Sequence, residues 1–185
     1  DEYLIESLKS QGAKINSWGV GTNLITCQDN PAFGGVYKLA ALEKNGEMIP
    51  KIKISENVAK ITTPCFKEVW RIFDRETDKA IADVITLNDE VIDDEKPYTI
   101  FDPNHTWKRK TVENFRAVRL RTQLFKNGEC LYQPRALSAI RAHCLAQVDT
   151  LWEEVTRFEN PHSYYVDLSQ KLWDEKNRLL SENQY

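Results

Sequence analysis

The spacing of apolar and polar residues near the N-terminus predicts a helix followed by a strand. Apolar side chains recur at helical spacing over residues 1–10, with charged residues between them, and Gly12 follows where a helix would end. The next segment, residues 13–18, is predicted as a buried strand that runs into a glycine loop. This helix–strand order is the repeating unit of a parallel α/β barrel.

Three later segments carry the alternation and turn signals of antiparallel hairpins. Asn45-Gly46 is a strong hairpin turn and lies within the first predicted hairpin, residues 35–55. The second predicted hairpin spans residues 68–87. The third spans residues 115–132 and turns at Lys126-Asn127-Gly128. We therefore expect antiparallel sheet after the first strand.

The C-terminal third of the chain predicts two helices. The first covers residues 135–158, where a 3.6-residue period of apolar side chains persists for about six turns. The second covers residues 166–181, with leucines on its inner face. Both helices are expected to pack on the hairpins, which gives an α+β fold: an end piece of an α/β barrel, then hairpins, then two helices.

Composition limits the classes of function. The 185 residues are 41% apolar, enough for a substantial core, and the net charge of −3 argues against general binding to nucleic acid or membrane surfaces. No run approaches the ~18 apolar residues of a membrane span. The four cysteines are scattered without a C-x-x-C pair, so we expect reduced thiols, no metal site and a cytoplasmic location.

The main candidate for ligand contact is the loop that follows the first predicted strand. Gly19 and Gly21 flank a single valine, so backbone N–H groups can approach a phosphate without an intervening Cβ, and Thr22 adds a hydroxyl donor. Phosphates bind at the carboxyl ends of barrel strands. A tight turn at the end of a strand explains the same residues, and the spacing alone leaves both interpretations open.

Two charged runs and three histidines are further candidates for substrate contact or catalysis. Residues 83–95 contain six acids and no base, whereas residues 108–121 contain six bases and one acid. These runs either complement each other or face water, or else the basic run steers a phosphorylated substrate. His105, His143 and His162 lie in no recognisable catalytic pattern. We assign none of them a catalytic role.

Several blocks of the sequence closely resemble the nicotinate phosphoribosyltransferase family. The resemblance begins at the glycine loop, continues in family order and spans nearly the whole chain; its blocks are residues 17–26, 31–39, 50–55, 60–64, 160–162 and 166–168. Because the family's chains are far longer, this chain resembles the C-terminal portion of the enzyme, cut inside its α/β barrel. The resemblance implies that the chain is a fragment of an α/β-barrel type II phosphoribosyltransferase. Residues 1–33 would then be an end piece of the barrel, and residues 34–185 would be a C-terminal α+β region.

The resemblance also implies an activity. Family enzymes join nicotinate to phosphoribosyl diphosphate, with ATP hydrolysis and Mg²⁺, and make nicotinate mononucleotide for NAD biosynthesis. The resemblance thus implies the classes ligase and glycosyltransferase, a cytoplasmic location and a homodimer. The resemblance implies that Gly21 and Thr22 contact the sugar-phosphate substrate and that Gly19 shapes the turn. The family's catalytic groups precede this segment, so we expect no catalytic residue, no bound cofactor and no turnover in the isolated chain.

Two other functions remain open from the sequence. In the first alternative, the hairpins and helices form a non-catalytic α+β interaction module, and residues 1–22 are an appended arm. In the other, the chain is part of a different phosphoribosyltransferase, such as a nicotinamide-specific or quinolinate-using enzyme. The blocks at residues 34–39 and 53–55 fit the nicotinate enzymes better.

Overall fold

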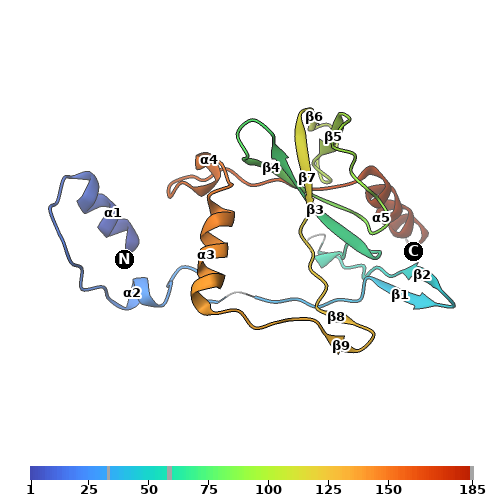
Figure 1. Ribbon diagram of the computed structural model, residues 1–185, viewed down its shortest axis with the longest axis horizontal. Coiled ribbons are helices and arrows are strands. Elements are labelled where there is room, and N and C mark those ends of the chain that lie inside the picture. Colours follow the sequence, from blue (N-terminus) through green and yellow to red (C-terminus); the bar gives the residue numbers. More distant parts are fainter. Residues whose placement is uncertain (33, 58–59, 184–185) are drawn as a thin grey trace. The chain divides into compact units, whose positions relative to one another are not determined.

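The structure is a computed structural model that describes residues 1–32, 34–57 and 60–183. It divides into two compact units, Asp1–Lys38 and Leu39–Tyr185, which we call the N-terminal and C-terminal units (Figure 1). Helices are combined with antiparallel hairpins, so the predicted α+β class is confirmed. The predicted domain boundary at residue 33 lies outside the described residues.

The N-terminal unit contains two helices. Helix α1, Glu2–Ser10, begins at Asp1, whose carboxylate accepts a hydrogen bond from the Leu4 N–H at 3.0 Å. Helix α2, Thr22–Ile25, is a single turn. The expected strand over residues 13–18 is not formed; the segment is irregular. A parallel strand needs neighbouring strands to bond its backbone, and no described segment pairs with this one.

The C-terminal unit is built on a four-stranded sheet of order β10-β4-β3-β7. Strands β3, Lys67–Asp74, and β4, Ala80–Leu87, form an antiparallel hairpin. Strand β7, Phe115–Arg119, adds antiparallel to β3, and β10, Val166–Leu168, adds parallel to β4. The sheet therefore joins segments from the middle and the end of the chain.

Three two-stranded hairpins extend this unit. Strands β1, Ala41–Lys44, and β2, Glu47–Pro50, meet at Asn45-Gly46, where both residues adopt positive φ. Strand β5, Tyr98–Phe101, pairs with β6, Arg109–Val112. Strand β8, Phe125–Lys126, pairs with β9, Glu129–Cys130.

The predicted hairpin over residues 115–132 is wrong as a single element. Its first part is β7, which pairs with β3, and only residues 125–130 form a hairpin of their own. Phe115 is fully buried, whereas residues 119–132 are all exposed. Burial of apolar side chains holds β7 on the main sheet, and nothing comparable holds the segment that follows.

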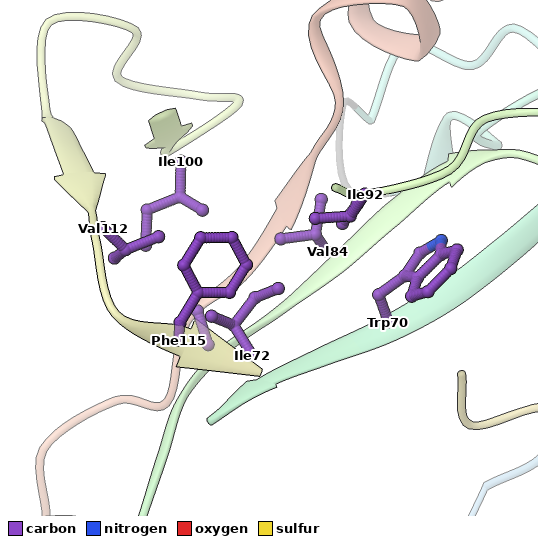
Figure 2. Packing of buried hydrophobic residues seen from close by; sticks show 8 residues of the cluster. Trp70, Ile72, Val84, Ile92, Ile100, Val112 and Phe115 are labelled. Atoms are coloured by element: carbon purple, nitrogen blue, oxygen red, sulfur yellow. The ribbon is translucent and has the colours of Figure 1, made fainter. Parts of the chain in front are cut away.

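The hydrophobic core lies on one face of the main sheet and under the β5–β6 hairpin. Ile72 and Val84 from the sheet meet Phe115 at its centre, and Ile100 and Val112 cover them from the hairpin, as Figure 2 shows. All are largely or fully buried. Trp70 lies at the edge of this cluster and donates a hydrogen bond from its indole N–H to the Thr86 hydroxyl at 3.2 Å.

The predicted helix over residues 135–158 is interrupted. Helix α3, Leu137–Val148, ends before a turn, and α4, Glu153–Thr156, is a separate short helix. The turn is fixed by the sheet: the Ala80 N–H donates to the Thr150 carbonyl at 2.8 Å, and the Lys79 ammonium donates to the carbonyls of Asp149 and Leu151 at 2.7 and 3.0 Å. These bonds take carbonyls that a continuous helix needs.

The expected packing of both helices on the hairpins holds for only one of them. None of the α3 residues is buried, and Leu137 is 80% exposed. By contrast, α5, Gln170–Glu182, buries Leu172 against Leu168 and Cys65. The Ser169 side chain caps α5 by accepting from the Leu172 N–H.

The predicted helix over residues 166–181 begins too early. Residues 166–168 form β10, whose partners are Asp83, Val84 and Ile85 of β4. The Ser169 N–H then donates to the Ile85 carbonyl at 2.8 Å, and α5 starts at Gln170. A buried position beside a central strand outweighs the helical period of the sequence.

Candidate functional site

The glycine loop lies on the surface of the N-terminal unit. Gly21 precedes α2 in an extended conformation, φ −97° and ψ −168°, and Thr22 is the first residue of that turn. A Cβ placed on Gly19 or Gly21 would meet no atom within 4 Å. Neither packing within the described residues nor backbone strain therefore requires glycine at these two positions. The loop leaves its backbone open to a ligand.

Local hydrogen bonds hold the residue that follows the glycines. The Thr22 carbonyl accepts from the Thr26 N–H at 2.9 Å and from the Thr26 hydroxyl at 2.7 Å. Both bonds are made by the backbone carbonyl of Thr22, not by its side-chain hydroxyl. The three predicted site residues are thus neighbours in one exposed loop. Their contact with a phosphate stays a prediction.

The C-terminal unit contains a cavity of about 1080 Å³. Its walls come from the β5–β6 connection, from the first residues of β4, from α4 and from residues 161–167. An adjoining cavity of about 290 Å³ shares six residues with it, among them Asp102, Lys108 and Asp167. These segments are far apart in sequence, so no local sequence pattern predicts the cavity.

A hydrogen-bonded group fixes one wall of the cavity. Arg71 binds both carboxylate oxygens of Asp83 at 2.8 and 3.0 Å, and the Tyr164 hydroxyl donates to the same carboxylate at 2.9 Å. Burial, followed by the charge of Asp83, raises the pKa of Tyr164, which therefore remains a donor. Arg71 also contacts Gln147 of α3 at 3.3 Å. Residues 161–167 are in this way held to the sheet.

Two carboxylates of the cavity differ in their surroundings. Asp102 accepts hydrogen bonds from the backbone of Asn104 and from the ring and backbone of His105 at 2.8 to 3.1 Å. Burial opposes the charge of Asp102, but these bonds outweigh it and lower the pKa of this carboxyl. Asp167 is only 4% exposed. Burial and then the charge of Asp102 raise the pKa of Asp167 to about 6.

Asp102 and Asp167 are not among the site residues predicted from the sequence. The available signal was an acidic residue between two apolar ones, Val166 and Leu168, in a segment expected to be helical. Within a strand, that position faces away from the side chains of its two neighbours. His162 also lines the cavity, whereas His105 is engaged by Asp102.

The arginines of the basic run 108–121 are used largely within the unit. Arg121 binds the buried carboxylate of Glu68 at 2.8 Å and stacks over Phe66. Arg119 stacks over Trp70, and Arg116 pairs with Asp78. These contacts support the structural interpretation of the run over substrate steering. Two of its lysines, Lys108 and Lys110, line the cavity.

The loop and the described helices show neither a metal site nor a membrane span. The described parts of the chain contain no group of three or more His, Cys, Asp or Glu side chains placed to hold a metal ion. The glycine loop, residues 17–22, has no carboxylate. These residues therefore do not fit a Mg²⁺ site. In residues 1–32, 34–57 and 60–183, none of the helices has the length and apolar character needed to cross a membrane.

Comparisons with known proteins identify the family. The profile described as "Nicotinate phosphoribosyltransferase C-terminal domain" matches residues 66–176. Nicotinate phosphoribosyltransferase of Bacillus subtilis (strain 168) is 43% identical over 182 residues, which cover 98% of this chain and 37% of that protein. The Caenorhabditis elegans enzyme of the same name is 35% identical over 185 residues, which cover 99% and 32%.

A solved structure gives the same answer for the fold. The crystal structure of human nicotinic acid phosphoribosyltransferase superposes with a TM-score of 0.57 and 22% identity, covering 64% of this chain and 24% of that one. The chain spans about a third of the length of the curated relatives it matches. It belongs to the nicotinate phosphoribosyltransferase family and corresponds to the C-terminal portion of these enzymes.

Proposed function

We propose that this chain is the C-terminal part of an enzyme that joins nicotinate to phosphoribosyl diphosphate. The reaction consumes ATP and yields nicotinate mononucleotide for NAD biosynthesis. The observation that carries the proposal is the 43% identity to the Bacillus subtilis enzyme over 98% of this chain. We further infer a cytoplasmic homodimer, as the resemblance to the family implies.

The N-terminal unit supplies one wall of the phosphate pocket in this proposal. Gly19 and Gly21 leave backbone N–H groups accessible, and Thr22 adds its hydroxyl to the phosphate of the sugar substrate. The open space around both glycines supports this role. Holding the phosphates rigidly favours departure of diphosphate, because positive charge develops at the ribose carbon during the transfer.

The chain supplies no catalytic residue in this account. Its glycine loop has no carboxylate for Mg²⁺, so we assign Mg²⁺ and ATP to other parts of the full-length enzyme. The isolated chain is accordingly expected to form no nicotinate mononucleotide. Its C-terminal unit has no catalytic role in this account.

An activity assay of the full-length enzyme that contains this chain tests the proposal. With phosphoribosyl diphosphate, ATP and Mg²⁺, we expect product from nicotinate and at least about 100-fold less from nicotinamide, because a site that recognises a carboxylate loses its charged contact with an amide. A preference for nicotinamide would instead favour the nicotinamide-specific alternative.

One observation favours the interaction-module alternative for part of the chain. The family profile, residues 66–176, lies wholly within the C-terminal unit, which has its own hydrophobic core. Removal of this unit from the full-length enzyme separates the two roles. If the unit only mediates interaction, the remaining enzyme keeps its turnover and loses a binding partner; if it supports the catalytic domain, turnover falls.

A further inference from the structure

A buried carboxylate without a partner opens into the cavity of the C-terminal unit. Asp167 is 4% exposed and lines both the 1080 Å³ cavity and its 290 Å³ neighbour. Across residues 1–32, 34–57 and 60–183, no side chain or backbone group donates a hydrogen bond to its carboxylate, and no cation pairs with it. Every fully enclosed side-chain N or O atom in these residues has a hydrogen-bond partner, so the unpartnered oxygens of Asp167 are not sealed off from the cavity. Such a group is costly to ionise unless a cation compensates it.

The cations beside the cavity interact with groups other than Asp167. The Lys108 ammonium lies 4.0 Å from Asp102, and the Lys110 charge acts on Asp74. The Arg109 guanidinium stacks on Phe101 with 5.1 Å to the ring centroid. Asp102 itself lies close enough to Asp167 for its charge to disfavour ionisation of the latter. Two carboxylates therefore face one space, and one of them lacks a counter-charge.

Aromatic side chains form much of the remaining wall. Trp152, Tyr164 and Tyr165 line the larger cavity, and Phe101 lines the smaller one. The negative faces of aromatic rings attract cations, and flat rings stack on them. The larger volume, about 1080 Å³, lies at the upper end of the range for small-molecule sites.

We propose that this cavity binds a small organic cation that carries an ammonium, amidinium or guanidinium group. The cationic group lies against Asp167, and the body of the ligand lies among Trp152, Tyr164 and Tyr165. The site belongs to the C-terminal unit alone and does not depend on the proposed phosphoribosyl transfer. Each of these cationic groups donates the hydrogen bonds that the Asp167 carboxylate lacks.

Calorimetric titration of benzamidine into the chain tests the proposal. Benzamidine joins an amidinium to an aromatic ring, and benzamide is its neutral counterpart of nearly equal shape. We expect saturable binding of benzamidine, none of benzamide, and at least about tenfold weaker binding of benzamidine to Asp167→Asn, because a charge-assisted bond contributes more than a neutral one. Thermal unfolding of the variant confirms that it is folded.

A matched control separates a specific contact from general electrostatics. Glu154→Gln removes the same charge from an exposed side chain of the same cavity and is expected to change affinity less than about twofold. Asp102→Asn, a second variant, is expected to have an intermediate effect. Equal losses in Glu154→Gln and Asp167→Asn, or no saturable binding to the wild type, would overturn the proposal. So would tighter binding of benzoate that is lost in Lys108→Gln.

Discussion

At the residue scale, Asp167 carries a charge that its surroundings disfavour. Its pKa of about 6 in the folded chain compares with 3.8 for an unperturbed aspartate, because burial and then Asp102 act against ionisation. Below pH 3.8 the carboxyl is neutral in both the folded and unfolded states. Between pH 3.8 and about 6 the unfolded chain ionises this group while the folded chain keeps it protonated, so the destabilisation of the fold grows across this window and stays constant above it.

We therefore predict that Asp167→Asn stabilises the chain at pH 8 and leaves its stability at pH 4 nearly unchanged. The gain in the free energy of unfolding at pH 8 is expected to be about 1–2 kcal/mol. Urea denaturation of both proteins at the two pH values measures it. A variant that is less stable than the wild type at pH 8 would contradict this account.

Glu68 illustrates the opposite case, a buried carboxylate with a partner. Arg121 binds its two oxygens at 2.8 and 3.1 Å, and this bonding is the largest cause of a lowered pKa for Glu68. Arg121→Ala removes both of these bonds and leaves the buried carboxylate only the more distant Arg119, 3.9 Å away, so it is expected to destabilise the chain by about 2 kcal/mol. Arg116→Ala breaks an exposed pair with Asp78 and is expected to cost less than about 1 kcal/mol. Equal costs in urea denaturation would refute the distinction.

At the scale of elements, the end of α3 depends on a distant residue. Lys79 precedes β4 and holds the carbonyls of Asp149 and Leu151. Lys79→Met keeps the aliphatic stem and removes the ammonium, so we expect the turn at residues 149–152 to open more often. Hydrogen exchange at the Ala80 amide, which bonds Thr150, should become about tenfold faster. Exchange across β3 and β7 should be unchanged; a general acceleration would point to global destabilisation instead.

Local signals explain which elements were predictable from the sequence. Asn45-Gly46 and Asn127-Gly128 fix tight turns by their own backbone preferences, so hairpins follow from them. Strand β10 and the interruption after α3 depend on partners more than 65 residues away, at Asp83 and Lys79. Sequence periods carry no information about such partners, and both segments were predicted as continuous helix.

The candidate sites divide in the same way. Gly19, Gly21 and Thr22 are adjacent in the chain, so a resemblance between sequences is enough to nominate them. The cavity around Asp167 joins the β5–β6 connection to residues 161–167, and only the folded sheet brings these together. A single acidic residue in an apolar strand is too weak a pattern to predict it.

At the scale of the whole molecule, the two units differ in how complete they are. The C-terminal unit has a buried core, whereas the N-terminal unit has no buried residue in either of its helices and leaves Ile15 and Val20 exposed. We predict that residues 39–185 alone unfold cooperatively, with a midpoint within about 5 °C of that of the whole chain. Calorimetry of both proteins checks this. A broad transition without a heat-capacity peak would show that the core needs the first 38 residues.

The central claim is that the glycine loop binds the phosphate of the sugar substrate. Steady-state kinetics of the full-length enzyme with Thr22→Val test it most directly, with Thr122→Val as a control that removes an exposed hydroxyl from the C-terminal unit. We predict that Thr22→Val raises the KM for phosphoribosyl diphosphate about tenfold or more and leaves the KM for nicotinate unchanged, because one hydrogen bond to a charged group is lost. The control should change neither value more than about twofold. An unchanged KM for phosphoribosyl diphosphate in Thr22→Val would contradict the claim.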